Sequence, residues 1–205
     1  MKMRLRRLEE KDAEGMLEWM GDSEIQKAFR FHAEQADMKS VLNFIKNADI
    51  RLADGKDLHY AIVDKEDEYL GTISLKNVEL SDKKAEYAIS LRKKAQGKGV
   101  ASAATEEILK VAFESYKLER IYLNVLSDNE RAVRLYERMG FVYEGAFRKH
   151  LFLRGEYKTL KWYSMLREEY AMKRQKMNGG GANPYGIKHR VLFTMPAMGF
   201  EKEVA

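Results

Sequence analysis

Three strand-like runs joined by short links constrain the fold of this chain more than any other feature. Residues 58–64, 69–80 and 84–91 are rich in β-branched and aromatic residues, with the spacing of half-buried strands. The links between them, KEDE and SDKK, are short, charged and compatible with turns. Parallel neighbours would need a crossover of about a dozen residues or more. The runs therefore predict an antiparallel meander.

Further elements flank this meander on both sides. Helical spacing of apolar residues and strand-like runs alternate along the chain. We expect an α/β fold with a mixed, mostly antiparallel sheet of about seven strands flanked by four helices. The additional expected elements are a strand at 4–8, a helix that Asp12 can cap and that carries Met16, Leu17 and Met20, a helix at 38–48, a helix from the QGKGVA turn to about Tyr116, a strand at 120–126, a helix at 130–139, and two strands at 141–153 and 157–166 around a turn at Arg154-Gly155.

Composition divides the chain and limits its function. Both prolines and five of the fourteen glycines follow residue 178, so we expect one domain at 1–170 and a basic tail of unknown role at 171–205. Residues 173–205 carry four of the five net positive charges. The body lacks the clustered basic face that nucleic acid requires, and no apolar run is long enough to span a membrane. These features favour a cytoplasmic protein with neither nucleic acid nor membrane as a partner.

Metal and thiol chemistry are also disfavoured. The chain has no cysteine, and its four histidines, His32, His59, His150 and His189, show no shared ligand spacing. We therefore expect no metal site.

The stretch QGKGVA, residues 96–101, places two glycines directly before an alanine-rich helix. Glycines permit positive φ and a close approach to the backbone, and the first helical turn offers unpaired N–H groups in a region that favours negative charge. The spacing fits neither a dinucleotide fingerprint nor a P-loop. The stretch is either an ordinary tight turn or a cradle for a phosphate group.

A second feature, LNVLSDNERAVRLYERMGF, follows about thirty residues later. Ser127 and Glu130 have capping-box spacing, Asn129 can cap instead, and Gly140 ends the helix. Tyr136 falls on the buried stripe with Ala132, Leu135 and Met139. It is either a core tyrosine with a satisfied hydroxyl or a buried proton donor.

Together these two features carry a resemblance. Gln96-x-x-Gly99-x-Ala101 after a strand, followed by Asn129, Ala132, Tyr136 and Gly140-Phe141, resembles the GNAT superfamily of acetyl-CoA-dependent N-acetyltransferases. The order of elements agrees from residue 3 to about 167. The closing stretch RGEYKTLKWYSML looks like the branch that acetylates ribosomal-protein N-terminal alanines, polyamines and nucleotide-linked amino sugars.

The resemblance implies roles for particular residues. It makes Tyr136 the general acid for the departing thiolate. Glu86 matches a frequent general base, although it could instead be a strand-end carboxylate paired with Lys84, and Tyr87 or Glu24 could take its place. The residues implied in binding acetyl-CoA are Ile89, Ser90, Leu91, Gln96, Gly97, Lys98, Gly99, Val100, Ala101, Ser102, Asn129 and Ala132.

The acceptor is less constrained than the coenzyme. Trp19, Glu24, Phe31 and His32 lie in or after the segment between the first two helices and could line the acceptor site, or they could be core and capping residues. An amino sugar, a protein N-terminus and a polyamine all remain open. The alternative function is a non-catalytic module that binds acetyl-CoA as a sensor or scaffold. A homodimer through the last strands is a family-level expectation.

Overall fold

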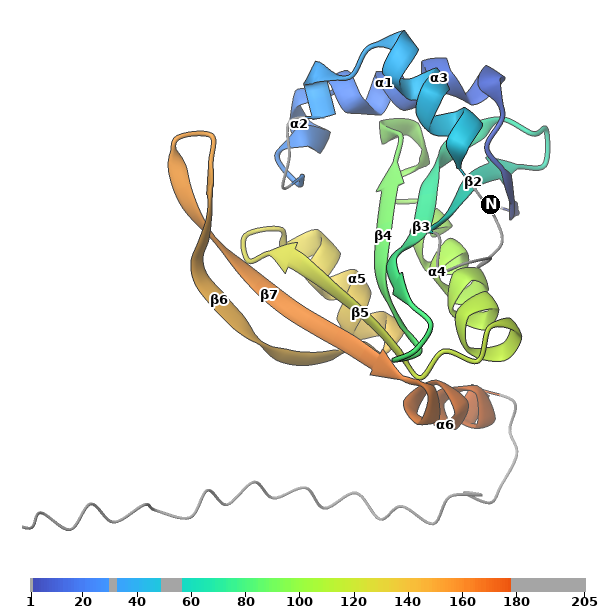
Figure 1. Ribbon diagram of the computed structural model, residues 1–205, viewed down its shortest axis with the longest axis vertical. Helices are drawn as coiled ribbons and strands as arrows, with labels where there is room; N and C mark the ends of the chain where they lie inside the picture. The colour runs from blue at the N-terminus through green and yellow to red at the C-terminus, as the bar shows by residue number, and fades with distance from the viewer. Residues whose placement is uncertain (1, 30–32, 49–56, 178–205) are drawn as a thin grey trace, which may run out of the picture.

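The computed structural model describes residues 2–29, 33–48 and 57–177, which form a seven-stranded sheet with helices around it (Figure 1). The strand order is β1-β2-β3-β4-β5-β7-β6, and every neighbouring pair is antiparallel except β4 and β5. The strands are β1 (Met3–Arg7), β2 (Leu58–Asp64), β3 (Tyr69–Glu79), β4 (Lys84–Leu91), β5 (Arg120–Leu126), β6 (Val142–Leu153) and β7 (Glu156–Leu166). The α-helices are α1 (Ala13–Gly21), α2 (Ser23–Gln26), α3 (Met38–Asn47), α4 (Val100–Lys110), α5 (Glu130–Met139) and α6 (Arg167–Met177).

The fold class and the meander are confirmed, but the number of helices was underestimated. The described part of the chain forms six α-helices rather than four. The two additional helices have weak sequence signals: α2 is a single turn, and α6 is strongly polar. Between α4 and β5, residues Val111–Ser115 continue the helix as a π-helical turn. Within the described residues, no helix has the length and apolar character needed to cross a membrane.

Helices cover the two faces of the sheet in different ways. Ile73, Leu75 and Tyr87 lie on one face and pack with Ile108 and other buried residues of α4 in the larger hydrophobic core. The opposite face meets α1 and α3 in a smaller core. Because alternate residues of a strand face opposite sides, β3 and β4 direct Thr72, Ser74 and Glu86 toward the side of α1 and α3.

The single parallel pairing is short. Lys84, Ala85 and Glu86 pair with Arg120, Ile121 and Tyr122, and the ladder ends there. Beyond these residues β4 and β5 diverge and open a wedge in the middle of the sheet, as the ribbon shows (Figure 1). The backbone groups of β4 that face the wedge therefore have no β5 partner after Glu86.

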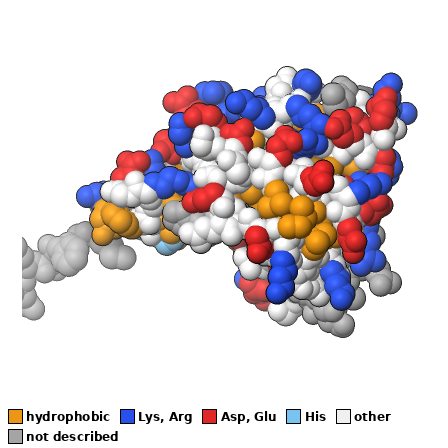
Figure 2. Space-filling model, turned by 90° about the horizontal axis from the view of Figure 1, so that it is seen from above, with side chains coloured by type: hydrophobic (Ala, Val, Ile, Leu, Met, Phe, Trp, Pro, Cys, Tyr) orange, Lys and Arg blue, Asp and Glu red, His pale blue; other side chains and the backbone are white. Residues whose placement is uncertain are grey.

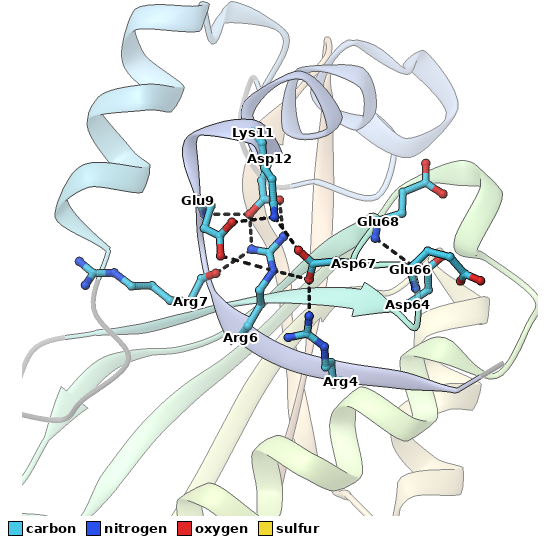
Figure 3. Close-up of polar contacts among 10 residues, drawn as sticks. All are labelled: Arg4, Arg6, Arg7, Glu9, Lys11, Asp12, Asp64, Glu66, Asp67 and Glu68. Atoms are coloured by element: carbon cyan, nitrogen blue, oxygen red, sulfur yellow. Dashed lines mark hydrogen bonds and ion pairs between the residues drawn. The ribbon is translucent and has the colours of Figure 1, made fainter.

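A charge cluster joins the N-terminal strand to the β2–β3 turn (Figure 3). Arg6 donates to both carboxylate oxygens of Asp12 at 2.7 and 2.8 Å and to Asp67 at 2.9 Å. Lys11 and Arg4 also bind Asp67. Asp12 was expected to cap the first helix with its side chain. Its carboxylate instead binds the guanidinium of Arg6 and accepts a hydrogen bond from the backbone N–H of Glu9 at 2.9 Å, so it makes no cap hydrogen bond to α1.

The β6–β7 hairpin extends away from the rest of the sheet and has the predicted turn at Arg154-Gly155, where both residues have positive φ. Several large apolar side chains of this hairpin are exposed, and Figure 2 shows hydrophobic side chains gathered at the hairpin end of the molecule. These exposed residues are Val142, Tyr143, Phe147, Phe152 and Tyr157.

Candidate active site

A cavity of about 1020 Å³ occupies the wedge between β4 and β5. Residues 86–91 of β4 form one wall, and Asn124, Val125 and Leu126 of β5 lie opposite. Helices α1 and α2 contribute Met16, Trp19, Met20, Glu24 and Ile25 to its lining, and the glycine-rich turn and α5 form the other end. The cavity therefore connects the two sequence features that flank the wedge.

The glycine-rich turn has the backbone geometry of an anion cradle. Gly97 and Gly99 adopt φ values of 76° and 78°, in the left-handed region where side chains other than glycine are strained. Gly99 is the N-cap of α4, and no side chain caps that helix. The N–H groups of its first turn are therefore available to an anion at the cavity mouth.

Two arginines of α5 donate hydrogen bonds to side chains at the two ends of the segment 96–102, which contains the glycine-rich turn. Arg131 donates to Gln96 Oε1 at 2.6 Å, and Arg138 donates to Ser102 Oγ at 3.1 Å. Gln96 in turn donates to the carbonyl of Leu91 at 3.2 Å, which ties the turn to the end of β4. Every expected coenzyme-binding residue except one lines the cavity. The exception is Lys98, which is exposed and outside the cavity lining.

Helix α5 delivers Tyr136 to the cavity. Of the two caps the sequence allowed, Asn129 is the one observed, since its side chain accepts the N–H of Ala132 at 3.2 Å. Tyr136 is 8% exposed, lines the cavity and packs edge-on against Tyr87 of β4, with ring centroids 5.8 Å apart. Burial raises the pKa of Tyr87 well above its usual value, and its hydroxyl bonds Thr105 at 2.8 Å. Tyr87 therefore remains protonated and positions the ring of Tyr136.

Glu86 enters the cavity from the other face of β4. It is 6% exposed and accepts a hydrogen bond from Asn77 Nδ2 at 2.7 Å, and Lys76 Nζ lies 3.9 Å from its other oxygen. Lys84, which the sequence suggested as its partner, pairs instead with Glu79 and Asp82. A register shift in β3 between Lys76 and Glu79, with Asn77 at a φ of 48°, accompanies the contact between Asn77 and Glu86.

The expected acceptor residues divide into three groups. Trp19 is 4% exposed, donates to the Tyr69 hydroxyl at 3.1 Å and packs on Phe29, so it is a core residue with one side on the cavity. Glu24 is exposed at the cavity rim and pairs with Lys27 at 2.7 Å. Phe31 and His32 lie outside the described residues.

Sequence reasoning missed several polar residues of the cavity. His59, Thr72, Ser74 and Lys76 line it from β2 and β3. The period-two spacing of Thr72, Ser74 and Lys76 was visible, but only the strand register places them and His59 on the same face as Glu86. Asn124 of β5 also lines the cavity, and its Oδ1 is buried with no hydrogen-bond partner among the described residues.

Comparison with known proteins agrees with this geometry. A family model described as an acetyltransferase (GNAT) domain matches residues 2–142. The chain belongs to the GNAT acetyltransferase family. The GNAT resemblance drawn from the two sequence features is thereby confirmed.

Individual GNAT relatives match over different lengths. YdaF of Bacillus subtilis (strain 168), provisionally named a ribosomal N-acetyltransferase, is 35% identical over 100 residues, or 49% of this chain and 55% of YdaF. Spermidine N(1)-acetyltransferase of Vibrio cholerae is 31% identical over 117 residues, or 57% of this chain and 68% of that protein. The match thus spans about half the length of YdaF. A crystal structure of spermidine N-acetyltransferase from Vibrio cholerae with CoA and spermine has a TM-score of 0.73 and 26% identity, covering 82% of this chain and 98% of that one.

The residues present fit the coenzyme that GNAT enzymes use. Uncapped helical N–H groups, with Arg131, Arg134 and Arg138 beside them, suit the phosphates of acetyl-CoA. The unpaired edge of β4 suits an extended arm that carries amides. Among the described residues, no three His, Asp or Glu side chains form a group that could hold a metal ion.

Proposed function

We propose that this GNAT protein transfers an acetyl group from acetyl-CoA to a primary amine by direct attack within a ternary complex. The observation that carries the proposal is the placement of Tyr136 and Glu86 on one cavity. Tyr136 reaches the cavity from α5 beside Tyr87, and Glu86 reaches it from the opposite face of β4. A proton donor and a carboxylate on opposite sides of the gap suit a reaction in which an amine arrives from one side and a thiolate leaves on the other.

Tyr136 acts as the general acid in this proposal. Bound acetyl-CoA supplies an activated acetyl thioester, and its phosphates would lie on the turn at residues 96–102. Tyr136 donates its hydroxyl proton to the departing thiolate, a form of assistance typically worth ~10²–10⁴-fold in rate. Backbone N–H groups on the unpaired edge of β4 stabilise the oxygen on which negative charge develops. The mechanism needs no covalent nucleophile from the protein.

Glu86 acts on the amine in this proposal, as its general base or as the group that holds the ammonium. Its carboxylate lines the cavity and is oriented by Asn77. Trp19 and Glu24 line the same cavity and support an amine acceptor there. The relatives named for ribosomal and spermidine acetylation keep a protein N-terminus and a polyamine among the candidate acceptors, together with an amino sugar.

Further parts of the proposal concern organisation. We infer one catalytic domain at residues 1–170, and the role of 171–205 stays undefined. The strand β6 is an edge of the sheet with exposed apolar side chains, which supports a homodimer through the last strands. A cytoplasmic location stays a prediction from the sequence.

Free-thiol release from acetyl-CoA tests the transfer reaction directly. Purified protein is challenged with amino sugars, with polyamines and with N-terminal peptides in separate pools. A rate with one pool is expected and would identify the acceptor class. Acetyl-CoA should also raise the thermal stability, as any ligand of the native state does. Stabilisation without turnover of any pool would instead support the sensor alternative.

Tyr136→Phe tests the proposed acid. We expect turnover to fall at least about tenfold, because the thiolate must leave unprotonated, while acetyl-CoA still stabilises the protein. Tyr157→Phe, on the exposed hairpin, is the matched control and should change neither quantity. An unaltered rate in Tyr136→Phe would remove Tyr136 from the mechanism.

A further inference from the structure

A polar row crosses the sheet beside Glu86. The strand register pairs His59 of β2 with Ser74 of β3, and Ser74 with Ala88 of β4. Cross-strand partners share a face, and Glu86 lies two residues before Ala88, so all four residues face the side of α1 and α3. All four also line the cavity. Ala88, at the widening of the wedge, therefore has Glu86 along its own strand and Ser74 across the ladder.

Ser74 and His59 form an ordered pair. Ser74 Oγ lies 2.8 Å from His59 Nδ1, and Ser74 is only 6% exposed. The edge of the imidazole packs against Phe44 of α3, with ring centroids 4.8 Å apart. These contacts restrain the ring. In the strand ladder, Ser74 is the polar group between His59 and Ala88.

The surroundings of His59 favour its neutral form. Burial lowers the pKa of His59 below its usual value. Of the charged groups around it, Asp57 opposes this shift and Lys76 adds to it. Glu86 of β4 faces the same cavity, and Phe44 is the contact from α3. At neutral pH the imidazole can therefore accept a proton, and an imidazole is intrinsically a stronger base than a carboxylate.

We propose that Ser74 and His59 form a proton relay that deprotonates the acceptor amine, while Glu86 holds the ammonium in place. The inference rests on the proposed acetyl transfer and assigns its base. The contacts of Glu86 support this division of roles. Asn77 orients one of its oxygens, and the other already faces an ammonium group, that of Lys76 at 3.9 Å, within the cavity lining.

The acceptor nitrogen loses two protons during the reaction. The ammonium gives one proton to Ser74 Oγ as the hydroxyl proton of Ser74 passes to His59 Nδ1. The nitrogen lone pair then forms the C–N bond to the acetyl carbon, and the C–S bond breaks with its electron pair on sulfur. Tyr136 protonates that sulfur and recovers the second proton that the nitrogen loses. His59 returns its proton to the solvent, so the reaction releases one proton.

The pH profile of the full-length enzyme tests the relay. Initial rates are measured from pH 5 to 9 with spermidine, with glucosamine and with an alanyl peptide as the amine probes. Wild-type kcat should fall at the acidic end of this range as His59 becomes protonated, and the fall should come below the usual imidazole range because burial lowers the pKa of His59. In His59→Gln this acidic limb should disappear and kcat at pH 7 should fall at least about tenfold. His150→Gln, an exposed histidine of the hairpin, should match the wild type.

Several outcomes would decide the inference. In Ser74→Ala we expect kcat to fall about tenfold while acetyl-CoA still stabilises the protein. This variant checks the relay with a smaller change of side-chain volume and contacts than His59→Gln. An acidic limb that persists in His59→Gln, with kcat within about twofold of wild type, would overturn the relay. A change in the KM for the amine alone would also overturn it, because that result assigns only binding to the pair. Wild-type protein that acetylates none of the three probes would contradict the acetyl transfer itself and remove the relay with it.

Discussion

Asp12 and Glu86 are two buried carboxylates in very different surroundings. Asp12 is 1% exposed, and a guanidinium and a backbone N–H enclose it with donors at 2.7 to 2.9 Å. Glu86 is 6% exposed, lines the cavity and accepts a hydrogen bond from the Asn77 amide at 2.7 Å, and Nζ of its cross-strand neighbour Lys76 lies 3.9 Å away.

The difference separates a structural carboxylate from one that can take a ligand. Burial of a charge is costly unless it is paired and hydrogen-bonded. The bidentate pairing with Arg6 provides this compensation for Asp12 and fixes the start of α1 on β1 (Figure 3). At Glu86 the nearby cation, Lys76, lies farther from the carboxylate, and the cavity allows the cation of a ligand to approach. Substitutions should therefore separate the two sites into one that affects folding and one that affects turnover.

The largest expected effect is on stability at the Arg6–Asp12 pair. Asp12→Ala leaves a nearly buried guanidinium with only part of its partners, and breaking a buried pair costs about 3–5 kcal/mol. Because Arg6 keeps Asp67 at 2.9 Å, we expect a loss of about 3 kcal/mol in the free energy of unfolding. Urea denaturation measures it, with Glu66→Ala, in an exposed pair with Lys65, as the control near zero. A loss below about 1 kcal/mol would mean that this pair does not fix the fold.

A smaller energetic effect, on turnover rather than stability, is expected at Glu86. Glu86→Gln keeps the size and the contact with Asn77 but removes the charge that holds an ammonium. We expect kcat/KM for the amine to fall about tenfold, equivalent to about 1.4 kcal/mol, with the free energy of unfolding changed by less than about 1 kcal/mol. Steady-state kinetics and urea denaturation of the same preparations give both values.

Glu79→Gln is the control for Glu86, since it changes an exposed carboxylate of β3 that pairs with Lys84. It should leave the rate unaltered. If Glu86→Gln destabilised the protein as strongly as Asp12→Ala while the activity per folded molecule stayed the same, the contrast between the two carboxylates would be wrong.

The strands and the main helices could be predicted because their signals are local. Residues 58–64, 84–91 and 120–126 form strands and 130–139 a helix within the predicted bounds, each with the expected periodicity and clear turn or cap residues. The cradle could be located for the same reason, since Gly97 and Gly99 mark a backbone that needs positive φ. Helices α2 and α6 lacked such signals.

The partners of the buried polar groups could not be predicted, because they depend on register and bulges. Lys84 is closer to Glu86 in sequence than Asn77 is, but the shifted register of β3 brings Asn77 to Glu86. His59 and Ser74 are fifteen positions apart and meet only through the β2–β3 ladder. Asp12 similarly binds Arg6 rather than capping α1, because the bidentate geometry of a guanidinium outweighs one cap hydrogen bond.

The smallest expected effect concerns the outer part of the charge cluster. Hydrogen bonds from Lys11 and Arg6 lower the pKa of Asp67 from 3.8 to about 2. A carboxylate with a lowered pKa in the folded state adds stability above its unfolded pKa and loses that contribution as the pH falls toward the folded value. Wild-type stability should therefore decline between about pH 4 and pH 2, and Asp67→Asn should show a shallower decline over that window. Thermal unfolding followed from pH 5 to pH 2 measures both slopes. The Asp67 side chain is 30% exposed, against 1% for Asp12, so the change should be much smaller than that of Asp12→Ala. Equal effects would show that the cluster acts as one unit rather than as a buried pair with a more exposed companion.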